Sequence, residues 1–288
     1  MENKAIEFFS GIGGWRYAFA GLGSVISAVD ISEVANSVYA MNFGVIPKVR
    51  ELATIRADEI KEIGSDSWLL SPPCQPYCRM GNSRDLADPR SAALVNLMKI
   101  LKQFPPKRFV MENVEGFLES NAFNLVGEHL EIAGLKWRTF CLCPSQFGFP
   151  NRRRRVFVIA SDEGIRNSLP PSSEPVAISS FLDEAEDKGL YLSVNILAKH
   201  KAGMDIVTKK SNRTACFIGG YGSRFVGSGS FLETSKGIRR FSPSEISRLL
   251  GFPASFRFPF HVSLANRYKL LGNSLNPVVA KWALGQLN

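Results

Sequence analysis

Short apolar segments alternate along this chain with stretches whose apolar residues repeat at helical spacing. The short apolar runs predict strands at residues 5–9, 25–29, 49–52, 68–70, 108–111, 138–142 and 156–160. Helical spacing and end signals predict helices at residues 15–20, 33–42, 54–63, 91–102, 120–133, 243–251 and 278–287. Strands that alternate with helices are typical of an α/β fold.

Two predicted helices carry explicit capping signals. Ser91 is a candidate N-cap, and the helix after it has an apolar stripe that we assign to the core, formed by Leu94, Leu97, Met98 and Leu101. Ser242 is a candidate N-cap with Pro243 at the first helical position and Glu245 at the third.

Composition changes after Asp162. Residues 163–190 are rich in Pro, Ser and charge, and residues 216–232 are rich in glycine with interleaved aromatic rings and Arg224. Aromatic rings beside basic groups suit single-stranded bases, whereas irregular hairpins with core aromatics are the alternative.

The charge balance favours a polyanionic partner. The 288 residues carry a net charge of +9 with a pI near 9.4, which is typical of proteins that bind nucleic acid. No apolar run approaches the roughly 18 residues of a membrane span, so we expect none. The odd number of cysteines, five, and a start that leads directly into a strand predict reduced thiols in a cytosolic or nuclear protein.

One cysteine lies on a stiff loop in Ser71-Pro72-Pro73-Cys74-Gln75-Pro76. The prolines fix φ and remove backbone donors, so the preceding strand cannot continue. The cysteine therefore lies at the carboxyl edge of a strand, where open α/β sheets bind ligands. A buried structural thiol is the alternative interpretation.

Three other segments place chemistry after strands. The glycine turn Ser10–Gly14 allows the backbone to approach a ligand closely. Asp30 suits either the hydroxyls of a ribose or the N-cap of a helix. Glu112 is either a second chemical group at the sheet edge that carries Cys74 or an ordinary surface ion-pair partner. In the run Asn151–Arg155, alternation places Arg153 and Arg155 on one face, although such runs are often solvated basic patches.

In this order, five separated pieces resemble the cytosine-5 methyltransferases: Phe9–Gly14, Pro72-Pro73-Cys74-Gln75, Glu112-Asn113-Val114, the Arg153/Arg155 pair and Gly272-Asn273-Ser274. Further segments are similar to the branch that is built like a DNA methyltransferase but acts on the anticodon loop of aspartate tRNA: Gln75–Gly81, Asp88–Ser91, Gly148–Asn151, Gly220–Ser223 and Leu250–Pro253. Ile218 and Cys78 replace hydroxyl residues of that branch.

The resemblance implies a Rossmann-like, mostly parallel sheet with helices on both faces, and a small target-recognition subdomain. We expect a catalytic domain at 1–162, the recognition subdomain at 163–240 and a return to the catalytic domain at 241–288. The methyl donor would be S-adenosyl-L-methionine and the substrate tRNA, in a cytoplasmic monomer, with no metal. The alternatives are a DNA cytosine-5 methyltransferase and a catalytically silent nucleic-acid-binding module.

The resemblance also implies residue roles. Cys74 would attack carbon 6 of cytosine, Glu112 would hold ring nitrogen 3, Arg155 the base carbonyl, and Arg153 the nearby backbone or thiolate loop. Donor-binding residues would be Phe9, Ser10, Gly11, Ile12, Gly13, Gly14, Asp30, Ile31, Leu52, Ser71, Asn273 and Ser274. Substrate-binding residues would be Gln75, Arg79, Asn113, Cys216, Phe217, Tyr221 and Arg224.

Overall fold

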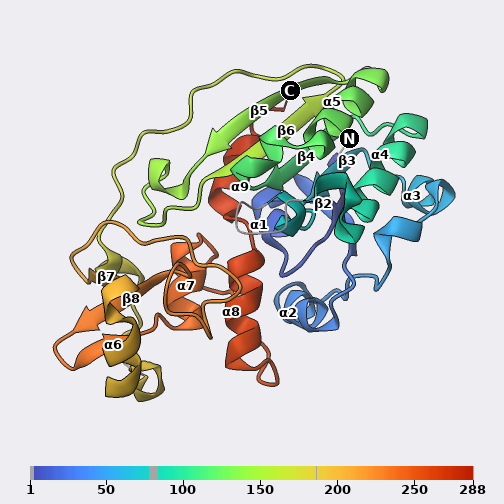
Figure 1. The fold of residues 1–288 in the computed structure, drawn as a ribbon. Coiled ribbons are helices and arrows are strands. Elements are labelled where there is room, and N and C mark those ends of the chain that lie inside the picture. The colour runs from blue at the N-terminus through green and yellow to red at the C-terminus, as the bar shows by residue number, and fades with distance from the viewer. Residues whose placement is uncertain (1–2, 78–83, 186, 288) are drawn as a thin grey trace.

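The computed structural model describes residues 3–77, 84–185 and 187–287 and is built on a six-stranded sheet (Figure 1). Its strands are β1 (Asn3–Phe8), β2 (Gly23–Val29), β3 (Ser67–Leu70), β4 (Arg108–Asn113), β5 (Lys136–Leu142) and β6 (Arg155–Ser161), in the order β2-β1-β3-β4-β6-β5. The pairs among β2, β1, β3 and β4 are parallel, and β6 runs antiparallel to both neighbours. The predicted mostly parallel α/β fold is confirmed.

Helices cover both faces of this sheet. One face packs against α3 (Ala57–Ile63), α4 (Ala92–Gln103) and α5 (Asn121–Ile132), and the other against α1 (Gly14–Phe19) and α9 (Pro277–Leu284). Strand β3 shows why both faces are apolar: Trp68 and Leu70 lie in the core under α4, whereas Leu69 lies in the core under α1. A strand buried on both faces reads as a continuous apolar run, which is how the sequence identified it.

A second hydrophobic core lies below the sheet in Figure 1. It is formed mainly by α6 (Val194–His200), the three-stranded sheet of β7 (Asp205–Thr208), β8 (Ser230–Thr234) and β9 (Gly237–Arg239), α7 (Pro243–Leu249) and α8 (Leu264–Asn273). Side chains from Leu275 onward pack under the large sheet instead. The three-part domain division stays a prediction. Within the segment 241–288, buried side chains up to Leu271 pack in the second core, and those from Leu275 onward pack against the large sheet.

The structure corrects several local predictions. No strand forms at 49–52: Lys48 makes a single bridge to Val29, and a 3-10 turn follows at Leu52–Thr54, capped by the Glu51 side chain. Ser91 stands at the start of α4, but its hydroxyl donates to the Asp85 carbonyl at 2.7 Å instead of capping the helix. The capping box at Ser242 and Glu245 is confirmed.

Asp30 is not the N-cap of α2 (Glu33–Phe43), because the Ser32 side chain takes that role by accepting from Ala35 N. The ligand-binding alternative for Asp30 therefore stays open. Helices α6 and α8 were not anticipated from the sequence, and the C-terminal helix ends at Leu284, earlier than expected.

Candidate active site

A cavity of about 590 Å³ opens at the carboxyl edge of the parallel strands. Residues that follow β1, β2, β3 and β4 line it, and α8 and the segment after it close it from the side of the second core. Cys74, Glu112, Arg153 and Arg155 all line this one cavity. The fold thus brings together four side chains that the sequence places up to 81 positions apart.

The turn after β1 forms one end of the cavity. Phe9 and Gly11 both adopt left-handed backbone conformations, with φ of 54° and 52°. Such a φ is rare for a bulky side chain, so the surrounding fold holds Phe9 in a strained conformation at a ligand-facing position. Gly14 is required for packing, because a Cβ there would lie 2.9 Å from the Leu275 side chain.

Asp30 connects this turn to the next strand. Its carboxylate accepts from Gly11 N and Ser32 N, each at 2.8 Å, and it lines the cavity. Burial raises the pKa of the Asp30 carboxyl above its ordinary value, although those backbone donors oppose the shift. A partly buried carboxylate at the tip of the second strand is the arrangement that binds ribose hydroxyls.

The cysteine loop is anchored from two sides. Trp15 donates its indole N–H to Ser71 Oγ at 2.9 Å, and the Asn113 amide donates to Pro72 O at 3.4 Å. Tyr77 N donates to Cys74 O at 3.0 Å, which closes the turn after the cysteine. Cys74 is therefore held at a fixed place on the cavity wall.

Glu112 and Arg155 form an ion pair inside the cavity. Arg155 Nε lies 3.2 Å from Glu112 Oε1, with side-chain exposed fractions of 17% and 10%. Burial raises the pKa of the Glu112 carboxyl, although the charges of Arg155 and Arg153 oppose the shift. The interpretation of Glu112 as a surface ion pair is therefore wrong: it is a buried carboxyl with a raised pKa.

Arg153 joins three segments of the chain. Its guanidinium donates to Phe217 O and Gly272 O, each at 3.0 Å, and to Ser274 O. Gly272 must be a glycine, since a Cβ there would lie 2.2 Å from the backbone of Ile218. Arg153 lines the cavity while both terminal nitrogens of its guanidinium bind backbone carbonyls, and its Nε is buried without a partner.

The predicted donor-binding residues largely gather at the cavity. Phe9, Ser10, Gly11, Ile12, Gly14, Asp30, Ile31, Leu52, Ser71, Asn273 and Ser274 line it. Gly13 does not line the cavity. It is the N-cap of α1 with a φ of 83°, and a Cβ there would overlap the Phe43 ring.

Fewer of the predicted substrate-binding residues line the cavity. Gln75 lines the cavity, whereas Asn113 is buried and holds the cysteine loop. Phe217 and Tyr221 are 1% and 0% exposed in the second core, so the prediction that their rings stack on bases is wrong. Cys216 contacts Arg153 and Arg155 and does not line the cavity. Arg224 is on an exposed loop, and Arg79 falls outside the described residues.

Sequence reasoning missed several cavity residues. Glu7 and Trp15 line its floor, and Asn266, Lys269 and Leu270 come from α8. A signal existed for Glu7, which is a carboxylate inside an otherwise apolar strand. The residues of α8 gave no comparable signal, because we expected no helix there.

Neither a metal cluster nor a membrane-spanning element emerges from the described parts of the chain. No group of three or more His, Cys, Asp or Glu side chains among residues 3–77, 84–185 and 187–287 could hold a metal ion. Within the same residues, every helix is too short or too polar to cross a bilayer.

Comparison with known proteins identifies relatives over almost the whole chain. The profile of the family described as C-5 cytosine-specific DNA methylase matches residues 3–221 and 194–288. A tRNA (cytosine(38)-C(5))-methyltransferase of Spodoptera frugiperda is 33% identical, over 96% of this chain and 96% of its own length. The enzyme of the same name from Schizosaccharomyces pombe is 31% identical, over 99% of this chain and 96% of its own.

The fold is shared with a solved structure of an Entamoeba histolytica methyltransferase. The two superpose with a TM-score of 0.94 at 28% identity, over 99% of this chain and 98% of the other. The shared fold therefore includes the segments that form both hydrophobic cores.

Proposed function

Because this chain belongs to the C-5 cytosine-specific methylase family, we propose that it methylates carbon 5 of a cytosine in the anticodon loop of a tRNA, preferably tRNA-Asp, with S-adenosyl-L-methionine as donor. The observation that carries the proposal is the shared cavity, which joins Cys74, Glu112 and Arg155 to the glycine turn after β1. The names of the two relatives, which specify cytosine 38 of tRNA, favour tRNA over DNA.

The residues at the glycine turn fit this donor. The volume of about 590 Å³ lies in the range of sites for nucleoside-sized ligands. Ser10 Oγ is buried without a partner, and a Cβ on Gly11 would meet no atom closer than 4.0 Å, so the turn has an unused polar group and space beside it. We assign the amino-acid end of the donor to Ser10–Gly14 and the ribose to Asp30. The donor supplies a methyl group on a positively charged sulfur.

In the proposed reaction, the Cys74 thiolate adds to carbon 6 of a cytosine that has left its stack. The new S–C bond pushes electron density to carbon 5, which takes up the methyl group. Glu112 holds ring nitrogen 3 and gives it a proton as charge builds there, which its raised pKa favours. Arg155 supports the base carbonyl. Water then takes the proton from carbon 5, the proton on ring nitrogen 3 returns to Glu112, and the Cys74 thiolate leaves carbon 6, which restores the ring.

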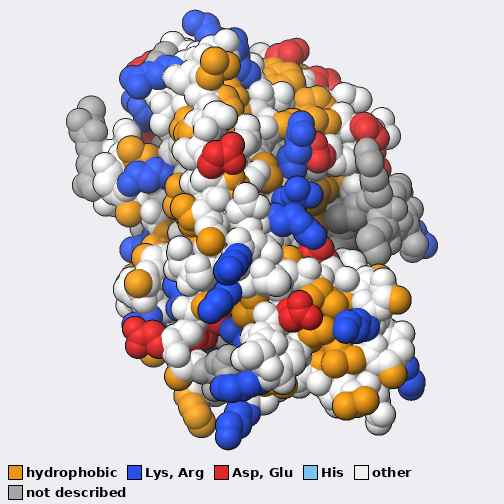
Figure 2. Space-filling model, turned by 90° about the vertical axis from the view of Figure 1, so that its left-hand side faces the viewer, with side chains coloured by type: hydrophobic (Ala, Val, Ile, Leu, Met, Phe, Trp, Pro, Cys, Tyr) orange, Lys and Arg blue, Asp and Glu red, His pale blue; other side chains and the backbone are white. Residues whose placement is uncertain are grey.

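The positive surface supports a polyanionic substrate. Figure 2 shows lysine and arginine side chains over both the upper and the lower part of the face in view, with acidic and hydrophobic side chains between them. With a net charge of +9, such a surface attracts the phosphates of RNA or DNA alike. The net charge therefore does not discriminate between RNA and DNA as substrate, so an activity assay is needed to do so.

The test is methyl transfer to unmodified tRNA and to duplex DNA in parallel. We expect transfer to tRNA-Asp by the wild-type chain and none by Cys74→Ala, which should still bind donor and tRNA. Glu112→Gln should bind the donor normally and lose most of its single-turnover rate. Efficient transfer to duplex DNA alone would contradict the tRNA substrate, and full turnover by Cys74→Ala would contradict the covalent role of the cysteine.

A further inference from the structure

The sulfur of Cys216 lies between the two active-site arginines. Arg153 Nη1 is 3.4 Å from Cys216 Sγ, and Arg155 Nη2 is 3.9 Å from it. Cys216 contacts both arginines but is not among the residues that line the cavity. A thiol proton on Cys216 would point at Phe217 O, which is 3.7 Å from the sulfur.

The surroundings of Cys216 favour a negative sulfur. Burial alone would raise the pKa of the thiol, but the charges and hydrogen bonds of Arg153 and Arg155 outweigh it and lower the pKa below its ordinary value. The other acidic groups near the two arginines are Glu112, from β4, and Cys74, from the loop after β3. At the end of α8, Arg153 donates to the backbone carbonyl of Gly272. Two cations thus face up to three acidic groups.

The two arginines differ in what else holds them. Arg153 has three carbonyl acceptors in addition to Cys216. Arg155 contacts Glu112, the Arg154 carbonyl at 2.8 Å, and Cys216. When the Glu112 carboxyl carries a proton, Arg155 loses its carboxylate partner, and the remaining acidic groups near it are Cys216, which its guanidinium contacts at 3.9 Å, and Cys74.

We propose that Cys216 is a positioning residue for methyl transfer, whose sulfur is the counter-ion that keeps Arg155 in place while Glu112 carries a proton. The inference rests on the proposed function and adds to it a second thiol with a role separate from that of Cys74. Cys74 forms a bond to the base, whereas Cys216 forms none and acts through the guanidinium of Arg155.

The charge on Cys216 predicts a direction for the effect of removing it. In Cys216→Ser a neutral hydroxyl replaces the anion, so the potential at the cavity becomes more positive. The Glu112 carboxylate and the Cys74 thiolate both become more stable, and both pKa values fall. The pH–rate profile of single-turnover transfer should therefore move to lower pH by about one unit, the usual effect of one nearby charge.

The experiment compares Cys216→Ser and Cys216→Ala with wild type and with Cys141→Ser, a cysteine of β5 outside the cavity. We expect the profile to shift in both Cys216 variants and not in Cys141→Ser. A rate that falls equally at every pH would overturn the inference, since a purely structural role scales the rate without moving the profile. Donor binding by each variant shows whether it is folded.

A second readout does not need activity. The ultraviolet absorbance of thiolates, titrated with pH in wild type and in Cys216→Ser, gives the ionisation of Cys216 by difference. We expect that step below the pH range of an ordinary thiol; a step at or above that range would overturn the inference. Failure of the proposed function would appear differently, as a wild-type chain that transfers no methyl group to tRNA.

Discussion

Glu7 is a carboxylic acid in the middle of an apolar strand, and it lines the cavity that holds Cys74 and Glu112. It accepts from Tyr39 OH at 2.9 Å and from Trp15 N at 3.2 Å, and it is fully buried. Burial raises its pKa to about 8, although Tyr39 and the charge of Arg16 oppose the shift. At neutral pH the folded chain therefore holds a proton on Glu7 that the unfolded chain has released.

This difference in proton binding makes stability depend on pH. Between the unfolded pKa near 4.5 and the folded value near 8, the folded state binds one more proton, so stability falls as pH rises. The slope for this group is roughly 1.4 kcal/mol per pH unit in that window. We expect Glu7→Gln, which mimics the protonated form, to flatten the curve of unfolding free energy against pH between about 5 and 8. Urea unfolding at several pH values measures this, and equal slopes in both proteins would contradict it.

Single residues were predictable where a local pattern set their direction. Alternation correctly placed Arg153 and Arg155 on the cavity face, while the Arg154 side chain is 60% exposed. The partners of Arg153 were not predictable, because its three carbonyl acceptors lie 64 to 121 positions away. The aromatic rings of Phe217 and Tyr221 were misassigned for the same reason: only the tertiary fold shows that they are buried.

At the scale of elements, one tryptophan connects the glycine turn after β1 to the loop that carries Cys74. Trp15 lies in the first turn of α1, where its backbone N–H is bound by Glu7. Its indole donates to Ser71 on the loop that carries Cys74. The buried ring thus couples the two elements to which we assign donor binding and attack on the base.

We expect Trp15→Phe to keep an aromatic ring in the core and to lose this hydrogen bond. A lost bond of roughly 1 kcal/mol corresponds to an about fivefold lower single-turnover rate if it acts fully on the position of the loop. Ser71→Ala removes the same bond from the other side. The double variant should therefore be less impaired than the sum of the two single changes, and strict additivity would show that the two residues do not interact.

Elements were predictable where caps and apolar spacing agreed. The helix after Ser242 follows from its capping box, and the strands of the large sheet follow from their apolar runs. The predicted strand at 49–52 fails because only Lys48 pairs with β2 before the chain turns. Helix α8 was missed although Ser263 caps it, because its polar residues Asn266 and Lys269 face the cavity and weaken the apolar pattern.

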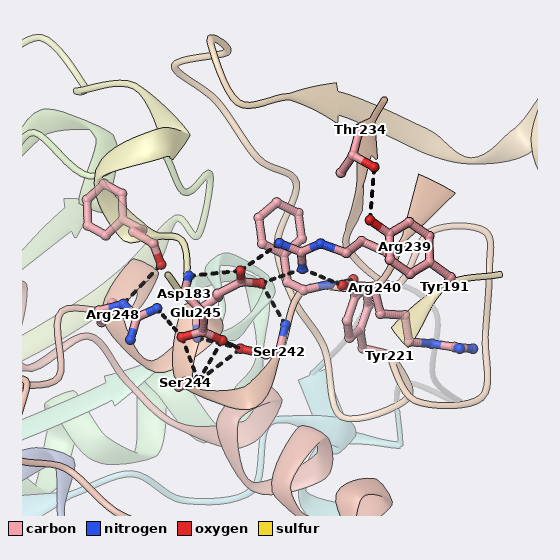
Figure 3. A network of polar contacts seen from close by, with 12 residues as sticks. Asp183, Tyr191, Tyr221, Thr234, Arg239, Arg240, Ser242, Ser244, Glu245 and Arg248 are labelled. Atoms are coloured by element: carbon pink, nitrogen blue, oxygen red, sulfur yellow. Dashed lines mark hydrogen bonds and ion pairs between the residues drawn. The ribbon is translucent and has the colours of Figure 1, made fainter. Parts of the chain in front are cut away.

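At the scale of the whole molecule, a buried ion pair ties the parts of the second core together (Figure 3). Arg239 at the end of β9 binds Glu245 of α7 through two contacts of 2.7 and 2.8 Å, with side chains 4% and 1% exposed. Glu245 also accepts from Asp183 N at 3.1 Å and from Ser242 N at 2.8 Å. One carboxylate therefore joins a strand, a helix start and the segment that leads into this core.

Glu245→Ala leaves Arg239 buried without its carboxylate, which typically costs about 3–5 kcal/mol of unfolding free energy. The matched control is Asp58→Ala, which breaks the Arg56–Asp58 pair on the surface, where the side chains are 67% and 58% exposed. We expect that change to cost far less unfolding free energy, because solvent screens an exposed ion pair. Urea unfolding of both variants measures the difference in unfolding free energy. Similar losses of unfolding free energy in the two variants would contradict the larger contribution that we assign to the buried pair.

The many carbonyls gathered on Arg153 have a consequence for how the enzyme matures. Its charge sits where water is excluded, and the backbone oxygens that neutralise it belong to segments the ribosome adds much later. In a chain that ends at β6, Arg153 still lacks those oxygens, because Phe217, Gly272 and Ser274 all follow β6 in the sequence. Arg153 should therefore gain its final set of partners only when the last of these segments docks, so the cavity that it lines is completed late in synthesis.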